Sequence, residues 1–259
     1  MRFVLVHGGF HAAWCWERTI DELRLLGHDG VAVDLPGHGA LVDQESTLPN
    51  RRDAILAAMD TGDGTTSVLV GHSGGGFDAT LAADGRPDLV SHVVYVAAAL
   101  PREGRTYPEA MAMRDSDDEL GEKFDGDVGE MLSYLKFDDD GAMWFADFAG
   151  AWKYFYHDCD EATARWAFER LGPERFGDTT VTPVSVPSFW EADLPRSFIR
   201  CLQDQSMPQW LADTVTRRLG VEQLTIDTSH SPFLSRPREL AELLLHATTT
   251  TPIAPLSPH

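Results

Sequence analysis

A serine in a glycine-rich turn is the residue best placed to do chemistry in this chain. Ser73 lies in the sequence GHSGG at residues 71–75, between the apolar run at 67–70 and a stretch with helical character. In the pattern G-x-S-x-G, the glycines let two backbones approach closely while a sharp strand-to-helix turn exposes the serine oxygen. We interpret Ser73 as a nucleophile. The alternative is a serine that only caps the following helix.

A serine hydroxyl needs a base to take its proton and a carboxylate to orient that base. His230 follows the last predicted strand in a loop of small polar residues, where the base of a chain ordered Ser, Asp, His must lie. Asp204 follows the preceding strand and could reach the far imidazole nitrogen. Asp193 precedes that strand and Asp227 is too close to His230, so both are weaker candidates. We predict a triad of Ser73, Asp204 and His230.

Two glycine turns could supply amide groups for the negative oxygen that forms when a nucleophile attacks a carbonyl. One donor is expected at Gly74, directly after the nucleophile. The other is expected in the turn HGGF at residues 7–10, with Gly9 favoured. A dinucleotide site is the alternative use of such a turn, but the spacing G-x-G-x-x-G is missing.

The other histidines near these turns have different interpretations. His7 and His72 flank glycines and are expected to be buried and hydrogen-bonded, and His38 is assigned no chemistry. The residues expected to line the substrate pocket beside the catalytic groups are Phe10, His11 and Phe233.

Short apolar runs alternate with longer amphipathic stretches, which is the pattern of a parallel α/β sheet. Because ligands gather at the carboxyl ends of parallel strands, the predicted catalytic groups should converge at one edge of the sheet. The predicted strands are 3–6, 30–33, 67–71, 93–98, 197–202 and 222–226, and the predicted helices are 14–26, 51–59, 75–83, 207–219 and 238–247.

The strand rhythm stops after residue 101 and returns after residue 195. We predict an α/β core of residues 1–101 and 196–247, interrupted by an acidic helical cap at 102–195, and a disordered tail at 248–259. Aromatic residues of this segment could line the pocket or form the core of the cap itself: Trp144, Phe145, Phe148, Trp152, Phe155 and Trp166.

Composition restricts the possible partners. A net charge of −20 disfavours nucleic acid and anionic membranes, and no apolar run is long enough to cross a bilayer. The chain enters a strand pattern at once, without room for a signal peptide, so a cytoplasmic location is expected. A monomer or homodimer acting on a small hydrophobic molecule fits these observations.

No metal or other cofactor is expected. Cys15, Cys159 and Cys201 lack zinc-site spacing and are interpreted as reduced thiols. The acidic runs at 115–119 and 138–140 lack the glycine and spacing of an EF-hand loop, so they are interpreted as solvated surface.

Over nearly its whole length the chain resembles the α/β-hydrolase fold family. The stretches FVLVHGGFHAAWCW at 3–16, DLPGHG at 34–39 and VYVAA at 94–98 are similar to the branch that contains plant methyl esterases, hydroxynitrile lyases and bacterial esterase relatives. The resemblance implies a mostly parallel sheet flanked by helices, with a helical cap. It places nucleophile, acid and base at Ser73, Asp204 and His230 and the oxyanion amides at Gly9 and Gly74, and the choice of Gly9 rests mainly on it.

The chain departs from the lyases of that branch. Gly8 stands where the lyases have threonine, SPF follows the base at 231–233, and no lysine occurs after Lys153. The positive charge that would neutralise departing cyanide is missing, so the favoured function is hydrolysis of a hydrophobic methyl, aryl or lactone ester through an acyl-enzyme. Lyase-like or other non-hydrolytic chemistry on a polyketide-like substrate and non-catalytic ligand binding are the alternatives.

Overall fold

A six-stranded parallel sheet forms the centre of the molecule, in the order β2-β1-β3-β4-β7-β8. The computed structural model describes residues 1–112, 129–139, 141–175 and 177–259. The strands are β1 (Arg2–Val6), β2 (Asp29–Val33), β3 (Ser67–His72), β4 (Val90–Val96), β7 (Arg196–Cys201) and β8 (Gln223–Ile226). The predicted α/β sheet is confirmed, and its strand boundaries shift by at most three residues.

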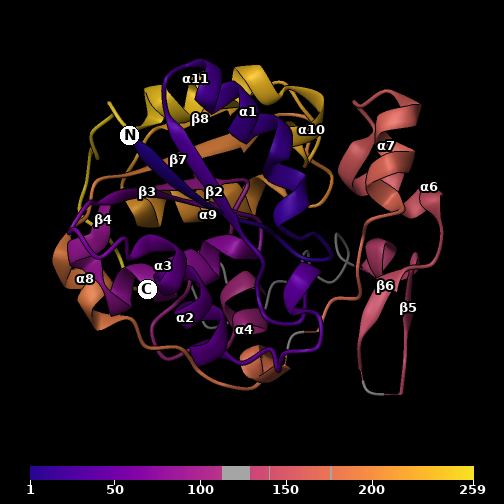
Figure 1. The fold of residues 1–259 in the computed structure, drawn as a ribbon. Coiled ribbons are helices and arrows are strands. Elements are labelled where there is room, and N and C mark those ends of the chain that lie inside the picture. The colour runs from indigo at the N-terminus through magenta and orange to yellow at the C-terminus, as the bar shows by residue number, and fades with distance from the viewer. Residues whose placement is uncertain (113–128, 140, 176) are drawn as a thin grey trace.

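Helices cover both faces of this sheet (Figure 1). On one face α1 (Glu17–Leu25) packs against α11 (Pro237–Ala247), and on the other α2 (Leu48–Met59) packs against α3 (Gly75–Gly85). Strands covered on both sides are buried along their whole length, and their central residues are apolar, as residues 68–70 of β3 illustrate. The other core helices are η1 (Ala13–Trp16), η2 (Gly39–Leu41), η3 (Pro87–Leu89), α9 (Gln209–Leu219) and α10 (Pro232–Ser235).

The segment between β4 and β7 is less helical than predicted. Its elements are α4 (Tyr107–Ala112), β5 (Leu135–Phe137), β6 (Met143–Phe145), α6 (Phe148–Ala151), the π-helix η4 (Trp152–Tyr156), α7 (Glu161–Phe168), η5 (Gly177–Thr180) and α8 (Pro187–Ala192). An antiparallel hairpin of β5 and β6 occurs where helix was expected.

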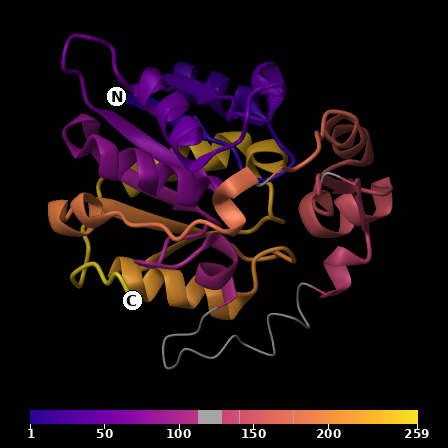
Figure 2. The same cartoon turned by 90° about the horizontal axis from the view of Figure 1, so that it is seen from below.

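Only part of this segment stands apart from the core. Figures 1 and 2 both show β5, β6, α6 and α7 grouped beside the sheet, and this group, together with η4 (Trp152–Tyr156), which directly follows α6, is called the cap below. By contrast, α8 packs against the core helix α3. The predicted boundary at residue 195 is therefore too late, because the chain rejoins the core before it enters β7.

Residues 248–259, which composition predicts to be disordered, pack against the core instead. The amides of Ile253 and Ala254 donate to the Gly220 carbonyl at 2.7 and 3.0 Å, and Arg196 donates to the Ala254 carbonyl at 2.9 Å. Gly220 ends α9 with φ +65°, and a Cβ there would lie 2.1 Å from the Ala254 oxygen. The tail is therefore ordered by backbone hydrogen bonds, which composition does not reveal.

Candidate active site

Ser73 sits on a strained turn between β3 and α3. Its φ is 53°, in the left-handed region that a residue with a side chain rarely adopts. A Cβ at Gly75 would lie 2.3 Å from the His7 carbonyl oxygen, and one at Gly71 would lie 2.6 Å from the Gly76 Cα. Both glycines of the G-x-S-x-G pattern are thus required by close backbone approach, and the strain is of the kind found at functional sites.

The loops after β7 and β8 bring a carboxylate and an imidazole together. His230 Nδ1 lies 2.7 Å from Asp204 Oδ2, and both side chains are buried. The other carboxylate oxygen, Oδ1, accepts the backbone N–H groups of Ser206 and Met207 at 2.7 and 2.9 Å. Because this leaves Oδ2 as an acceptor, His230 carries its proton on Nδ1 and keeps Nε2 free to accept one.

Two aromatic neighbours fix the position of His230. His72 Nε2 donates to the His230 carbonyl oxygen at 2.8 Å. The ring of Phe155, from the π-helix η4, stacks on the His230 ring with 5.5 Å between centroids. His230 is therefore held from the core on one side and from the cap segment on the other.

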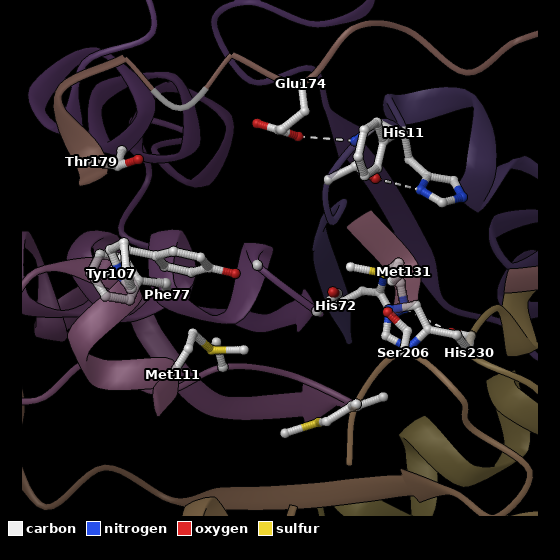
Figure 3. Close-up of a pocket in the computed structure, with 18 of the residues that line it drawn as sticks. His11, His72, Phe77, Tyr107, Met111, Met131, Glu174, Thr179, Ser206 and His230 are labelled. Carbon is white, nitrogen blue, oxygen red and sulfur yellow. Dashed lines mark hydrogen bonds between the residues drawn. The ribbon is translucent and has the colours of Figure 1, made fainter. Parts of the chain in front are cut away.

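Ser73 and His230 line the same cavity, whose volume is about 320 Å³. Figure 3 shows this cavity, with His230 and His72 on one side and Tyr107 opposite. The structure contains no hydrogen bond between the Ser73 and His230 side chains within the described residues. In enzymes without bound substrate this bond is often long and tightens only in the Michaelis complex.

Gly9 and Gly74, the predicted oxyanion donors, line this cavity as well. The turn that carries Gly9 is clamped from outside the sheet. Phe10, with φ 65°, donates its N–H to Glu174 Oε2 at 2.9 Å, and its carbonyl accepts the Gly172 N–H at 2.8 Å. The segment after α7 therefore holds the turn whose amide the chemistry would use.

The predicted pocket residues separate into two groups. Phe10 and His11 line the cavity, and so does Phe155, one of the aromatic residues weighed from the cap. The residues placed elsewhere are Trp144, Phe148, Trp152 and Phe233. Phe148 packs on Trp152, and Phe233 lies fully buried in the core. The i, i+4 aromatic spacing thus mostly marks packing within the cap, and this part of the pocket prediction needs correction.

Sequence patterns did not predict several of the residues that line the cavity. The larger, mostly apolar ones are Phe77, Tyr107, Pro108, Met111, Met131, Leu132, Leu135, Met143, Met207, Pro208 and Leu211. Three charged residues also line the cavity: Arg51, Asp78 and Glu174. Arg51 and Asp78 form a buried ion pair with two hydrogen bonds of 2.8 and 2.7 Å. No local sequence signal distinguishes these residues from ordinary core or surface positions.

The histidines expected to be structural are buried and hydrogen-bonded. His7 Nδ1 lies 2.8 Å from the Gly8 carbonyl, and its Nε2 accepts the Leu35 N–H. Burial lowers the pKa of His7 and of His72 well below the usual value. Burial also lowers the pKa of His11 to about 4. These rings are therefore neutral at physiological pH and polarise no substrate by charge.

No group of three or more His, Cys, Asp or Glu side chains suited to a metal ion occurs in the described parts of the chain. The acidic run at 115–119 lies outside those parts. Across the same ranges, no helix has both the length and the apolar character to cross a membrane.

The sequence from residue 3 to residue 243 matches the alpha/beta hydrolase family. The chain belongs to this family. The resemblance predicted from the motifs is therefore confirmed. As expected for an alpha/beta hydrolase, the sharp serine turn and the loops carrying Asp204 and His230 all lie at the carboxyl ends of strands.

Plant esterases are among the curated relatives of this alpha/beta hydrolase. Methylesterase 7 of Arabidopsis thaliana is 28% identical over 94% of this chain and 95% of its own length. Esterase PIR7B of Oryza sativa subsp. japonica is 40% identical, but the match covers 43% of this chain and 48% of the rice protein.

Solved structures share the fold. Polyneuridine aldehyde esterase superposes with a TM-score of 0.79 at 24% identity, covering 95% of this chain and 98% of that one. An extracellular alpha/beta-hydrolase from a Paenibacillus species superposes with a TM-score of 0.76 at 21% identity, over 96% and 100% of the two chains.

Proposed function

We propose that this alpha/beta hydrolase cleaves a carboxylic ester through an acyl-enzyme formed on Ser73. The observation that carries the proposal is the 2.7 Å contact between His230 Nδ1 and Asp204 Oδ2, beside a strained serine in the same cavity. Two relatives that match this chain, Methylesterase 7 and Esterase PIR7B, support the same chemistry by their names.

The reaction would proceed in two halves. In the first, His230 Nε2 takes the hydroxyl proton as Ser73 Oγ attacks the ester carbon, and Asp204 stabilises the ring that becomes charged. His230 then gives the proton to the departing alkoxide oxygen, and the acyl group stays on Oγ. In the second half, His230 takes a proton from water as the water attacks the acyl carbon, and then gives that proton to Ser73 Oγ as the bond between Oγ and the acyl carbon breaks, which releases the acid and the free serine.

The amides of Gly9 and Gly74 would bind the oxygen that becomes negative in both halves. Removing one such donor typically costs about 3 kcal/mol of transition-state stabilisation. The mostly apolar lining, with its phenylalanine and methionine side chains, suits a hydrophobic acyl or alcohol group, and a cavity of about 320 Å³ fits a small molecule.

Labelling with a fluorophosphonate tests the central step. We expect one covalent adduct, mapped by peptide mass spectrometry to Ser73, and hydrolysis of p-nitrophenyl esters that is lost in the Ser73→Ala variant. Ser231→Ala is a matched control, because Ser231 is buried near the base but does not line the cavity. Adduct formation at another residue, or ester hydrolysis that persists in Ser73→Ala, would refute the proposal.

A further inference from the structure

Glu174 brings a buried carboxylate to the wall of the cavity, where the ester chemistry gives it no role. Its exposed fraction is 2%, and it lines the same cavity as Ser73. Oε2 accepts the Phe10 N–H at 2.9 Å and lies 3.1 Å from His38 Nε2. Oε1 has no hydrogen-bond partner in the described part of the structure. The protein thus provides hydrogen-bond partners for Oε2, whereas Oε1 could accept a hydrogen bond from a ligand.

The carboxylate lies next to the predicted oxyanion turn. A Cβ placed on Gly9 would be 3.0 Å from Glu174 Oε2. In Figure 3 one oxygen of Glu174 is joined by a dashed line to a backbone nitrogen, and the other points toward the side of Thr179 and Tyr107. A group that reached Oε1 would therefore lie beside the turn that carries Gly9, the predicted oxyanion donor.

Glu174 is charged at neutral pH. Burial by itself raises the pKa of Glu174, but His38, Arg51 and the Phe10 amide outweigh burial and lower it to about 2. A buried carboxylate oxygen without a donor is costly, because the water that it loses is not replaced.

Arg51, whose charge acts on Glu174, makes its hydrogen bonds to other side chains. Arg51 gives Nε and Nη2 to Asp78, and its Nη1 donates to Ser46 at 3.1 Å. These bonds use three of the five guanidinium N–H groups and hold Arg51 against Asp78 and Ser46, and Glu174 Oε1 accepts none of the others in the described part of the structure. A donor that enters with the ligand would complete the site.

We propose that Glu174 Oε1 accepts a hydrogen bond from a hydroxyl or N–H group of the substrate, so that the preferred ester carries such a donor near its scissile carbonyl. This inference rests on the proposed function and narrows its substrate class from hydrophobic esters to esters with one polar donor. Glu174 is then a specificity residue as well as the anchor of the Phe10 turn.

Matched pairs of esters test the inference. The probes are methyl 3-phenylpropanoate and its derivatives with one hydroxyl at chain carbon 3, ring carbon 3 or ring carbon 4, each beside its methyl ether. The ether keeps the size and the oxygen but cannot donate. For at least one position we expect kcat/KM of the hydroxyl ester to exceed that of its ether by about 10- to 100-fold, the usual range for a hydrogen bond to a charged group.

The variant Glu174→Gln sharpens the test. Its amide oxygen can still accept the Phe10 N–H while its NH₂ group faces the cavity, so we expect the hydroxyl-to-ether ratio to fall at least tenfold. Glu191→Gln, at an exposed acid on α8, should leave the ratio unchanged. If Glu174→Gln lowers kcat/KM equally for hydroxyl and ether esters, Glu174 acts only by holding the turn that carries Phe10. That result would overturn the inference.

The hydroxyl-to-ether ratio of kcat/KM in the wild-type protein also tests the inference, whether or not the Glu174→Gln variant folds. Ratios near one for all three positions overturn the inference even if every ester is hydrolysed. If no ester is hydrolysed, the proposed function fails separately, and calorimetric binding of the same pairs to the wild-type protein still reports the preference. Tighter binding of a hydroxyl compound than of its ether supports the site, and equal binding overturns it.

Discussion

Gly8 and Ser73 come so close that a Cβ added to Gly8 would lie 2.6 Å from the Ser73 Cβ. Carbon atoms of two residues that are not bonded to each other do not approach to this distance. The two turns can therefore meet only because residue 8 has no side chain. The turn after β1 and the turn after β3 are thereby locked together, and this contact brings the predicted oxyanion turn to Ser73.

Replacing Gly8 with alanine should therefore separate the two turns. We expect Gly8→Ala to lower kcat/KM for a p-nitrophenyl ester by roughly 100-fold, since small displacements of reacting groups have effects of that size. Gly172→Ala is the control, because a Cβ at Gly172 would meet nothing within 4 Å. Unchanged activity in Gly8→Ala would mean that the contact is not needed for positioning.

Asparagine at position 204 should reverse the tautomer of His230. Oδ1 of Asp204 accepts two backbone N–H groups, so the oxygen of an asparagine would stay there and its NH₂ would face His230 Nδ1. The ring would then carry its proton on Nε2 and could not accept one from Ser73. We expect kcat for ester hydrolysis to fall by roughly 10⁴-fold, as for a similar triad change elsewhere.

The control for that change is Asp227→Asn, because Asp227 is exposed and bonds to Gln203 rather than to His230. Its kcat should match the wild type. If kcat falls little in Asp204→Asn but strongly in Asp227→Asn, the carboxylate that orients His230 is that of residue 227.

Folding stability should fall in mild acid. In the folded protein burial lowers the pKa of His11 to about 4, whereas an unfolded histidine titrates near about 6.5. The unfolded chain binds the additional proton between these values, so the free energy of unfolding is unaffected by His11 above about pH 6.5 and decreases as the pH falls toward 4. For this one group the full loss is about 3 kcal/mol, and the lowered pKa values of His7 and His72 act in the same direction.

Denaturant titrations at several pH values between 7.5 and 4.5 measure this dependence. His11 Nδ1 lies 2.8 Å from the Gly9 carbonyl, and Nε2 lies 2.8 Å from the Tyr156 hydroxyl, a pattern that a neutral ring satisfies. His11→Gln removes the titrating group, so its unfolding free energy should change less steeply with pH. Identical slopes for variant and wild type would contradict a neutral buried His11.

Deleting residues 252–259 should destabilise the core, although composition marks this tail as disordered. The Ala254 carbonyl accepts from Arg196, and the Pro258 carbonyl accepts from Arg218, two arginines that are 0% and 3% exposed. Losing these acceptors should lower the free energy of unfolding by about 3 kcal/mol. Ile253→Ser is the control, because Ile253 is 68% exposed and its replacement should change stability by less than about 0.5 kcal/mol. Equal stability of the truncated and full chains would show that the tail contributes nothing.

The positions of Ser73, Asp204 and His230 at strand ends were predictable from the sequence because they depend on local patterns. Ser73 lies between a buried strand and a helix. The glycines on either side of it predict the close approach of two backbone segments that the structure shows. Asp204 and His230 follow consecutive strands of one parallel sheet, and parallel strands end at the same edge. Alternation of strand and helix was enough to bring these residues to one place.

Only the tertiary structure decided what surrounds them. Glu174 comes from an acidic stretch far along the chain, yet it is buried against Phe10 and His38. The spacing of Phe148 and Trp152 resembles a pocket wall, but the two rings pack on each other in the cap. Such contacts join residues distant in sequence, and their energy depends on burial and on partners that no local pattern encodes. The sequence by itself therefore determined the sheet and the proposed catalytic groups, while long-range packing decided the cavity wall, the hairpin and the ordered tail.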